Sequence, residues 1–216
     1  MTKTQRLRMT IDITMTILSI ILMGGNYLFP ADIVHEILGV GLFVLWAVHI
    51  ILNRRWYGAI FRGKYNAYRV MQTVINCCIL ICTIFLMISG IILSNHIFTF
   101  LNIQGGLGFA RLAHLLASHW YYLFMSLHIG LHVGHLFQNV TAKIIPRIIL
   151  ALVCAYGIYA FIARGVWKYL ILRQHFFFFD LDRGYILFAI DYISIIILFA
   201  TLSHLLVKSM CQRYLK

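Results

Sequence analysis

Apolar runs of eighteen or more residues recur along the whole chain and constrain its fold more than any other feature. A run of this length crosses the ~30 Å hydrocarbon layer of a bilayer when it is helical. Inside lipid, every backbone polar group must be satisfied within the protein, which an open sheet cannot achieve. The alternating pattern of a membrane β-barrel is absent from the sequence. We therefore expect an all-α membrane protein.

Composition and charge agree with a single membrane domain. Hydrophobic residues make up 62% of the 216 residues and charged residues only 11%, whereas a soluble domain carries roughly 25% charged residues. A net charge of +12 would suggest nucleic-acid binding in a soluble protein. Here the basic residues flank the apolar runs, where positive-inside bias and lipid phosphates account for them. We therefore expect membrane lipid as a partner and no nucleic acid.

The apolar runs predict six transmembrane helices. These helices cover residues 9–29, 33–53, 68–94, 111–137, 147–168 and 185–207. The first four are expected to form a four-helix core within residues 1–138. Residues 139–216 would add two further transmembrane helices of unknown role.

The basic residues also predict the orientation of the chain. They lie in the N-terminal tail, in the loop of residues 54–69, around residues 143–147 and at the C-terminus. All four regions fall on one side of the membrane if the six segments alternate. Because Lys and Arg are enriched in cytoplasmic loops, we expect both termini in the cytoplasm. The chain would then be a multi-pass protein of the cell inner (cytoplasmic) membrane.

Two pairs of histidines share one unusual spacing. His35 and His49 lie fourteen positions apart on the second segment, and His114 and His128 lie fourteen positions apart on the fourth. On a helix this separation keeps each pair within about 40° on one face, with a rise of roughly 21 Å. Each segment therefore carries one histidine near each edge of the hydrocarbon layer.

The second and fourth segments run in the same direction, so their histidines meet at two levels. His35 is expected opposite His114 near the outer face, and His49 opposite His128 near the cytoplasmic face. Two imidazoles at one level suit the axial ligands of a haem that transfers electrons. No Cys-x-x-Cys-His motif for covalent haem attachment is present. We therefore predict that the four-helix core binds iron as two b-type haems; the alternative is that these histidines only hydrogen-bond between helices.

The inner ligand has a second candidate, His132, one turn beyond His128 on the same face. We favour His128 because only it reproduces the fourteen-position separation of the second segment. His132 and His135 would then line a quinone or proton site on the cytoplasmic side.

Two arginines are candidates for contact with the anionic haem propionates. Arg111 stands one turn before His114, and Arg55 stands just past His49. Ordinary flanking of a membrane segment is the alternative for each arginine. Small residues near the ligands would leave room for the porphyrin rings. These are Gly39, Gly41, Ser118, Gly130 and Gly134.

Residues 8–138 resemble the flavinylation-associated cytochromes of bacteria, which are di-haem cytochrome b-like membrane proteins. The motifs that carry the likeness are His35-Glu36-x-x-Gly39, His49 followed by Asn53-Arg54-Arg55-Trp56, Ile91-Ile92-Leu93-Ser94, Arg111-x-x-His114 and Met125-Ser126-Leu127-His128-Ile129-Gly130-Leu131-His132. The resemblance implies a cytochrome that passes electrons from a quinol pool or a cytosolic-side donor to an extracytosolic protein carrying flavin. Residues 147–216 lie outside it.

Electron transport across the membrane through two haems is therefore the function that we expect first. One alternative keeps the haems but makes the protein a quinone-linked oxidoreductase that acts on superoxide or ferric iron at the outer face. The other is a haem-free membrane anchor or transporter, which the paired histidine spacing disfavours.

Overall fold

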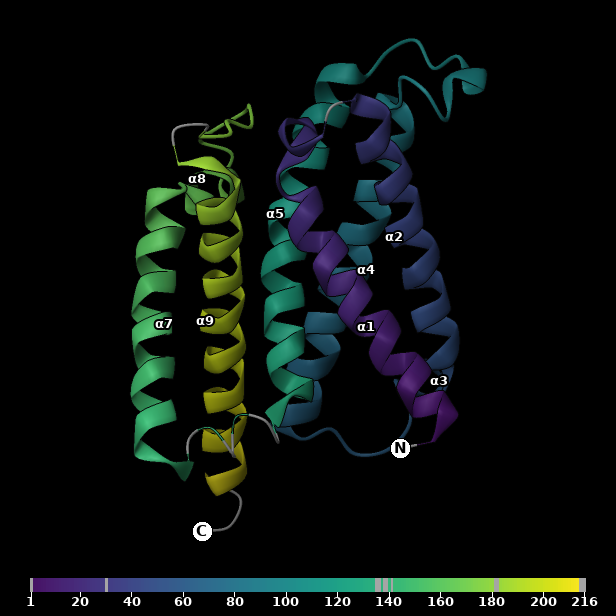
Figure 1. Ribbon diagram of the computed structural model, residues 1–216. Helices are drawn as coiled ribbons and strands as arrows, with labels where there is room; N and C mark the ends of the chain where they lie inside the picture. Colours follow the sequence, from purple (N-terminus) through teal and green to yellow (C-terminus); the bar gives the residue numbers. More distant parts are fainter. Residues whose placement is uncertain are drawn as a thin grey trace.

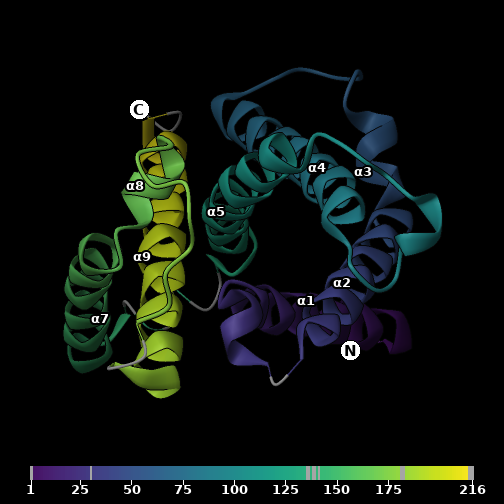
Figure 2. The same cartoon turned by 90° about the horizontal axis from the view of Figure 1, so that it is seen from above.

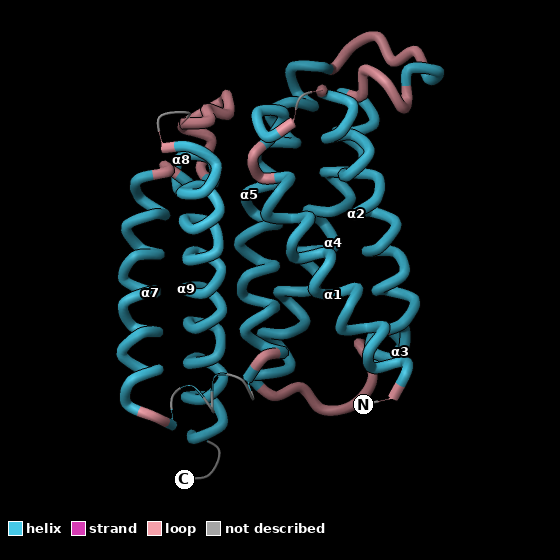
Figure 3. The backbone as a smooth tube through the Cα atoms, viewed as in Figure 1, coloured by secondary structure: helices cyan, strands magenta, loops and turns pink. Residues whose placement is uncertain are grey.

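The computed structural model describes residues 2–29, 31–134, 137, 140, 142–180 and 183–213. Regular structure within these ranges is entirely helical, with no strand, as the tube in Figure 3 shows. The all-α prediction is therefore confirmed for the described part of the chain.

Six long helices follow one another along the chain. They are α1 (Lys3–Leu22), α2 (Asp32–Leu52), α4 (Ala67–Leu93), α5 (Leu107–His132), α7 (Ile144–Ala163) and α9 (Gly184–Arg213). Short helices join some of them, namely the 3-10 turns Gly25–Leu28 and Thr99–Leu101 and the α-helices α3 (Arg54–Ala59) and α8 (Val166–Leu170). The long helices coincide with the six apolar segments, with ends displaced by a few residues.

Four of these helices are long and apolar enough to cross a membrane: α2, α4, α7 and residues Gly184–Met210 of α9. The long helices also expose many large apolar side chains, which suit contact with lipid. The chain is therefore a membrane protein by the length and composition of its helices. Six spans were expected, but α1 and α5 are more polar than the other four.

The polarity of α1 and α5 has a clear origin in their sequences. The first turns of α1 carry Lys3, Arg6 and Arg8, with Asp12 following. Arg111 and four histidines interrupt the apolar residues of α5. Charged and imidazole side chains are costly in hydrocarbon unless they face the protein interior.

The helices run alongside one another in two groups (Figure 1). Seen along the helices, α1, α2, α4 and α5 surround one axis, α9 lies beside α5, and α7 lies on the far side of α9 (Figure 2). The start of α1 and the end of α9 lie at the same end of the molecule as α3, opposite α8. The predicted boundary at residue 138 falls on a residue outside the described ranges.

The contact between α5 and α9 depends on a glycine. A Cβ at Gly130 would lie 2.1 Å from the carbonyl oxygen of Ala200, and one at Gly134 would lie 3.4 Å from Nδ1 of His204. Both glycines therefore face α9. Our expectation that they leave room for a ring beside His128 was wrong, because sequence position alone did not show which helix lies against them.

Candidate functional site: two pairs of histidines

The structure brings the four predicted histidines together in the expected pairs. The ring centroids of His35 and His114 are 6.4 Å apart, with an interplanar angle of 61°. The ring centroids of His49 and His128 are also 6.4 Å apart, with an angle of 72°. In both pairs the first histidine comes from α2 and the second from α5.

This separation excludes a direct hydrogen bond between the two rings of a pair. An imidazole nitrogen lies about 1.1 Å from its ring centre, since the ring bonds resemble a C–N bond with partial double-bond character. The nitrogens of a pair therefore stay about 4 Å apart or more, beyond hydrogen-bond distance. A metal bonded to both rings at about 2 Å, as in other imidazole–metal bonds, needs nitrogens about 4 Å apart. The observed spacing therefore suits two axial imidazoles on one iron.

Two of the histidines are oriented by acceptors on neighbouring helices. Nδ1 of His49 lies 2.7 Å from Oδ1 of Asp12 on α1. Nδ1 of His128 lies 2.7 Å from Oδ1 of Asn76 on α4. These oxygens accept hydrogen bonds, so Nδ1 carries the proton in each ring. Metal-ligating histidines make this type of contact with their second nitrogen, which leaves the lone pair of Nε2 for the metal.

His114 is held in the same way by a hydroxyl group. Its Nδ1 lies 3.0 Å from Oγ of Ser89, and Oγ of Ser89 donates its own hydrogen to the carbonyl of Phe85 at 2.6 Å. The serine oxygen is therefore an acceptor toward the ring, and Nδ1 of His114 is the donor. Nε2 of His114 is then the nitrogen available for a ligand.

His35 differs from the other three. Its Nδ1 is buried and forms no hydrogen bond within the described residues, although the backbone carbonyl of Gly25 lies nearby. The next residue, Glu36, fixes this end of α2. Its carboxylate accepts hydrogen bonds from Oγ of Ser94 at 2.6 Å and from the backbone nitrogen atoms of residues 95–97. The end of α2 is thereby attached to the end of α4.

The two candidates for the inner position have different surroundings, and the choice of His128 stays a prediction. His132 lies beside His128, with ring centroids 4.5 Å apart, but it is solvent-exposed. Among the described residues, the ring found opposite His49 at the pair distance is that of His128. Nε2 of His49 also lies 3.5 Å from Nδ2 of Asn53, at the outer limit of a hydrogen bond. His135 lies outside the described residues.

The two arginine candidates sit at helix ends and are exposed. Arg111 lies in the first turns of α5, and Arg55 lies in α3 directly after α2. Within the described ranges, neither forms an ion pair. Their guanidinium groups are therefore free of a carboxylate partner in that part of the chain, and contact with a propionate stays a prediction.

The space around α2 is loosely filled. None of its 21 residues is buried, and a Cβ at Gly39 or Gly41 would meet nothing within 4 Å. A cavity of about 60 Å³ lies between α2, α4 and α5. The residues that α2 contributes to its lining lie between His35 and His49. The lining residues are Leu42, Phe43, Trp46, Thr83, Leu86, Met87 and Tyr121. Open glycines and an unburied helix suit a planar group between α2 and α5.

No cluster of three or more His, Cys, Asp or Glu that could hold a metal ion occurs within the described residues. A self-contained metal site made only of side chains is therefore not seen there. A haem differs from such a site because the porphyrin supplies four nitrogens and the protein supplies only the axial ligands.

Sequence reasoning missed the side chains that orient the rings. Asn76, Ser89 and Asp12 are polar residues within segments otherwise rich in apolar ones. Polar residues in a membrane helix face the protein interior. That rule could have marked these residues as interior, but their histidine partners follow only from the packing of α1 and α4.

A second buried polar cluster joins α7 and α9. Asp191 is 0% exposed, and its carboxylate lies 2.8 Å from Nε of Arg164, whose side chain is 8% exposed. The carboxylate also accepts a hydrogen bond from Tyr156, and the guanidinium of Arg183 lies 3.7 Å away. This cluster was not predicted, although Asp191 interrupts a long apolar run.

The remaining buried histidine of α5, His119, stacks on Tyr169 of α8, with ring centroids 4.2 Å apart. Its Nδ1 bonds the carbonyl oxygen of Leu115 at 2.8 Å. This histidine therefore contributes to the contact between α5 and α8.

Comparison with known proteins identifies no relative of this chain. No protein-family model, curated protein or solved structure matches the chain. The resemblance to flavinylation-associated cytochromes therefore stays a prediction from the histidine motifs, and the function must be argued from the geometry described above.

Proposed function

We propose that the protein transfers electrons across the membrane through two b-type haems. His35 and His114 would ligate the outer haem, and His49 and His128 the inner one. The observation that carries the proposal is the ring separation of 6.4 Å, found in both pairs. The two rings of a pair are too far apart to hydrogen-bond to each other but are spaced to share one iron, and three of the rings also hydrogen-bond to α1 or α4.

The residues of this chain fit the group. A bound haem b would supply a reversible one-electron iron centre, held by one histidine of α2 and one of α5. Asp12, Ser89 and Asn76 accept hydrogen bonds from Nδ1 of three of the proposed ligand rings. These bonds fix the tautomer and the orientation of each ring. Arg111 and Arg55 would stand near the propionates of the outer and the inner haem.

The same proposal explains why α1 and α5 are polar. Asp12 contacts His49, and His114 and His128 lie opposite the histidines of α2, so these polar groups have partners within the protein. Such partners would let both helices span the membrane. We infer six spans in the cell inner (cytoplasmic) membrane, with both termini cytoplasmic and the first four helices forming the haem bundle. The basic residues of the N-terminal tail, of residues 54–69 and of residues 143–147 support this orientation.

Electrons would enter from a quinol or a cytosolic-side donor and leave to an extracytosolic redox protein that carries flavin. This assignment of partners rests on the resemblance of residues 8–138. The histidine geometry supports electron transfer through two haems, but it does not indicate the donor or the acceptor.

The test is the haem content of the purified protein. We expect two haems per chain, released fully by acidified organic solvent, and a reduced-minus-oxidised spectrum of b-type haem. His35→Ala and His114→Ala should each remove the same component of a redox titration, and His49→Ala and His128→Ala the other. His132→Ala should spare both. A haem-free protein, or loss of the inner haem in His132→Ala alone, would contradict the assignment.

A further inference from the structure

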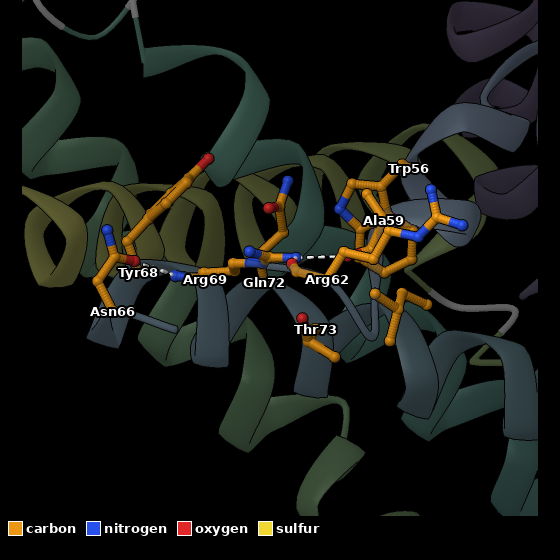
Figure 4. Close-up of a pocket in the computed structure, with 9 residues that line it drawn as sticks. Trp56, Ala59, Arg62, Asn66, Tyr68, Arg69, Gln72 and Thr73 are labelled. Atoms are coloured by element: carbon orange, nitrogen blue, oxygen red, sulfur yellow. Dashed lines mark hydrogen bonds between the residues drawn. The ribbon is translucent and has the colours of Figure 1, made fainter. Parts of the chain in front are cut away.

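A cavity in the described part of the chain lies between α3 and the start of α4 (Figure 4). Its volume is about 380 Å³, within the range of roughly 300–1,000 Å³ that is typical of small-molecule sites. The lining residues are Trp56, Ala59, Ile60, Arg62, Asn66, Tyr68, Arg69, Gln72 and Thr73. Aromatic, apolar and hydrogen-bonding side chains thus share one concave surface.

The residues that line this cavity are close in sequence to those that contact the inner histidine pair, His49 and His128. On α4, Gln72 and Thr73 precede Asn76, the partner of His128, by one helical turn. On the other side, Trp56 lies in α3, which follows α2 directly after Asn53. The side chain of Asn53 donates a hydrogen bond to the backbone carbonyl of His49. The cavity therefore lies next to the inner pair, at the end of the molecule where the basic loop of residues 54–69 is found.

One of the two arginines that line the cavity is already engaged within the protein. The guanidinium of Arg69 already donates to the carbonyl oxygens of residues 59, 62 and 64 and lies over the ring of Tyr65, 4.4 Å from its centroid. Arg69 thus holds the turn between α3 and α4. Arg62 is then the only lining cation whose guanidinium makes no contact within the described residues.

The remaining polar groups suit a flat, neutral ligand. The side chains of Tyr68, Gln72 and Thr73 form no hydrogen bond with any described residue, so they can bind a ligand oxygen. Trp56 and Tyr68 offer ring faces for stacking. A ring with an oxygen at each end matches these groups better than a charged headgroup does.

We propose that this cavity binds the ring of a quinol, with Gln72 and Thr73 bonding its oxygens and Trp56 stacking on it. The role as electron donor rests on the proposed function. Oxidation of the quinol to the quinone breaks its two O–H bonds and releases two protons and two electrons. The protons pass to water at the basic face, and the two electrons reduce two ferric haem irons to the ferrous state.

Direct binding of a short-chain benzoquinone to the purified, haem-loaded protein tests the site. The variant carries Gln72→Leu and Thr73→Val, which remove the hydrogen bonds and keep the side-chain volumes. We expect the affinity to fall about tenfold or more, with the haem spectrum unchanged. The matched control carries Gln104→Leu and Thr99→Val, the same exchanges in the loop at the opposite end of the helices. The control should bind like the unchanged protein.

Three outcomes separate this proposal from the proposed function. Equal affinity in the variant and in the unchanged protein overturns the quinol site and leaves the haems in place. Displacement of the quinone by phosphatidylglycerol vesicles, but not by neutral phosphatidylcholine vesicles, shows an acidic-lipid site and also overturns it. A haem-free protein whose quinone binding is lost in the variant supports the site and overturns its role as donor to haem.

Discussion

Each histidine has two ring nitrogens, and the structure assigns them different partners. Asp12, Ser89 and Asn76 contact Nδ1 of three rings, and Nε2 of His49 lies 3.5 Å from Nδ2 of Asn53. The fourteen-position spacing predicts which histidines pair. It does not predict the Nδ1 partners, because these come from helices whose rotation about their axes is set by packing.

Removal of the Asn76 acceptor should weaken the inner haem alone. Loss of such a contact typically costs about 10- to 100-fold in metal affinity, so Asn76→Leu should lower the inner-haem occupancy and leave the outer haem bound. Asn76→Asp keeps an oxygen acceptor and should restore occupancy. Haem per chain and redox titration measure both effects. An equal loss of both haems in Asn76→Leu would point to general misfolding instead.

At the scale of helices, α5 is central because α4, α8 and α9 all pack against it. Its face toward α9 is close-packed at Gly130, whereas α2 on the other side has no buried residue. The apolar runs predict where the helices lie, since each long run has to be buried or face lipid. They do not predict which faces touch, so the contact of α5 with α9 was missed.

Substitution at Gly130 should destabilise the protein through this contact. In Gly130→Ala the new Cβ would lie 2.1 Å from the carbonyl oxygen of Ala200, and overpacking of this kind costs about 1–3 kcal/mol. Gly108→Ala is the control in the same helix, because its Cβ would meet nothing within 4 Å. Thermal unfolding in detergent should show a lower Tm for Gly130→Ala only. Equal Tm values would mean that α9 does not approach α5 this closely.

The pair of Arg164 and Asp191 should behave as one unit between α7 and α9. Asp191→Leu leaves a guanidinium buried without its carboxylate, which typically costs about 3–5 kcal/mol. The double variant Arg164→Leu with Asp191→Leu removes the unpaired charge and should recover much of the loss. Thermal unfolding of the two single variants and the double variant forms a cycle. Additive losses would show that the two side chains act independently.

At the scale of the whole molecule, the two histidine pairs lie near opposite ends of α2 and α5. Within α2 and within α5 the two histidines are separated by a rise of roughly 21 Å, which is most of a ~30 Å hydrocarbon layer. The start of α1 and the end of α9 lie at the same end of the molecule as α3 (Figure 1), which directly follows the end of α2 that carries His49. One haem alone would therefore reach only one side.

Loss of either haem should stop electron transfer across the membrane rather than slow it. The assay uses liposomes with quinol on the cytoplasmic side of the protein and a membrane-impermeant flavin acceptor on the other. His35→Ala and His49→Ala should each abolish reduction of the acceptor, while His96→Ala, in an exposed loop, should not. Wild-type rates in either single-haem variant would refute a relay through two haems.

Because no residue of α2 is buried, we expect the lifetime of the protein to depend on whether haem is bound. Besides its packing against α1, α2 is held by the contact of His49 with Asp12, by the hydrogen bond from Arg8 to the carbonyl of Leu52 and by the bonds of Glu36 to residues 94–97. It also carries one ligand of each proposed haem, so the two cofactors would supply most of its interior contacts. A newly made chain that receives no haem would keep α2 open to proteases, and iron starvation would lower the abundance of the protein through degradation.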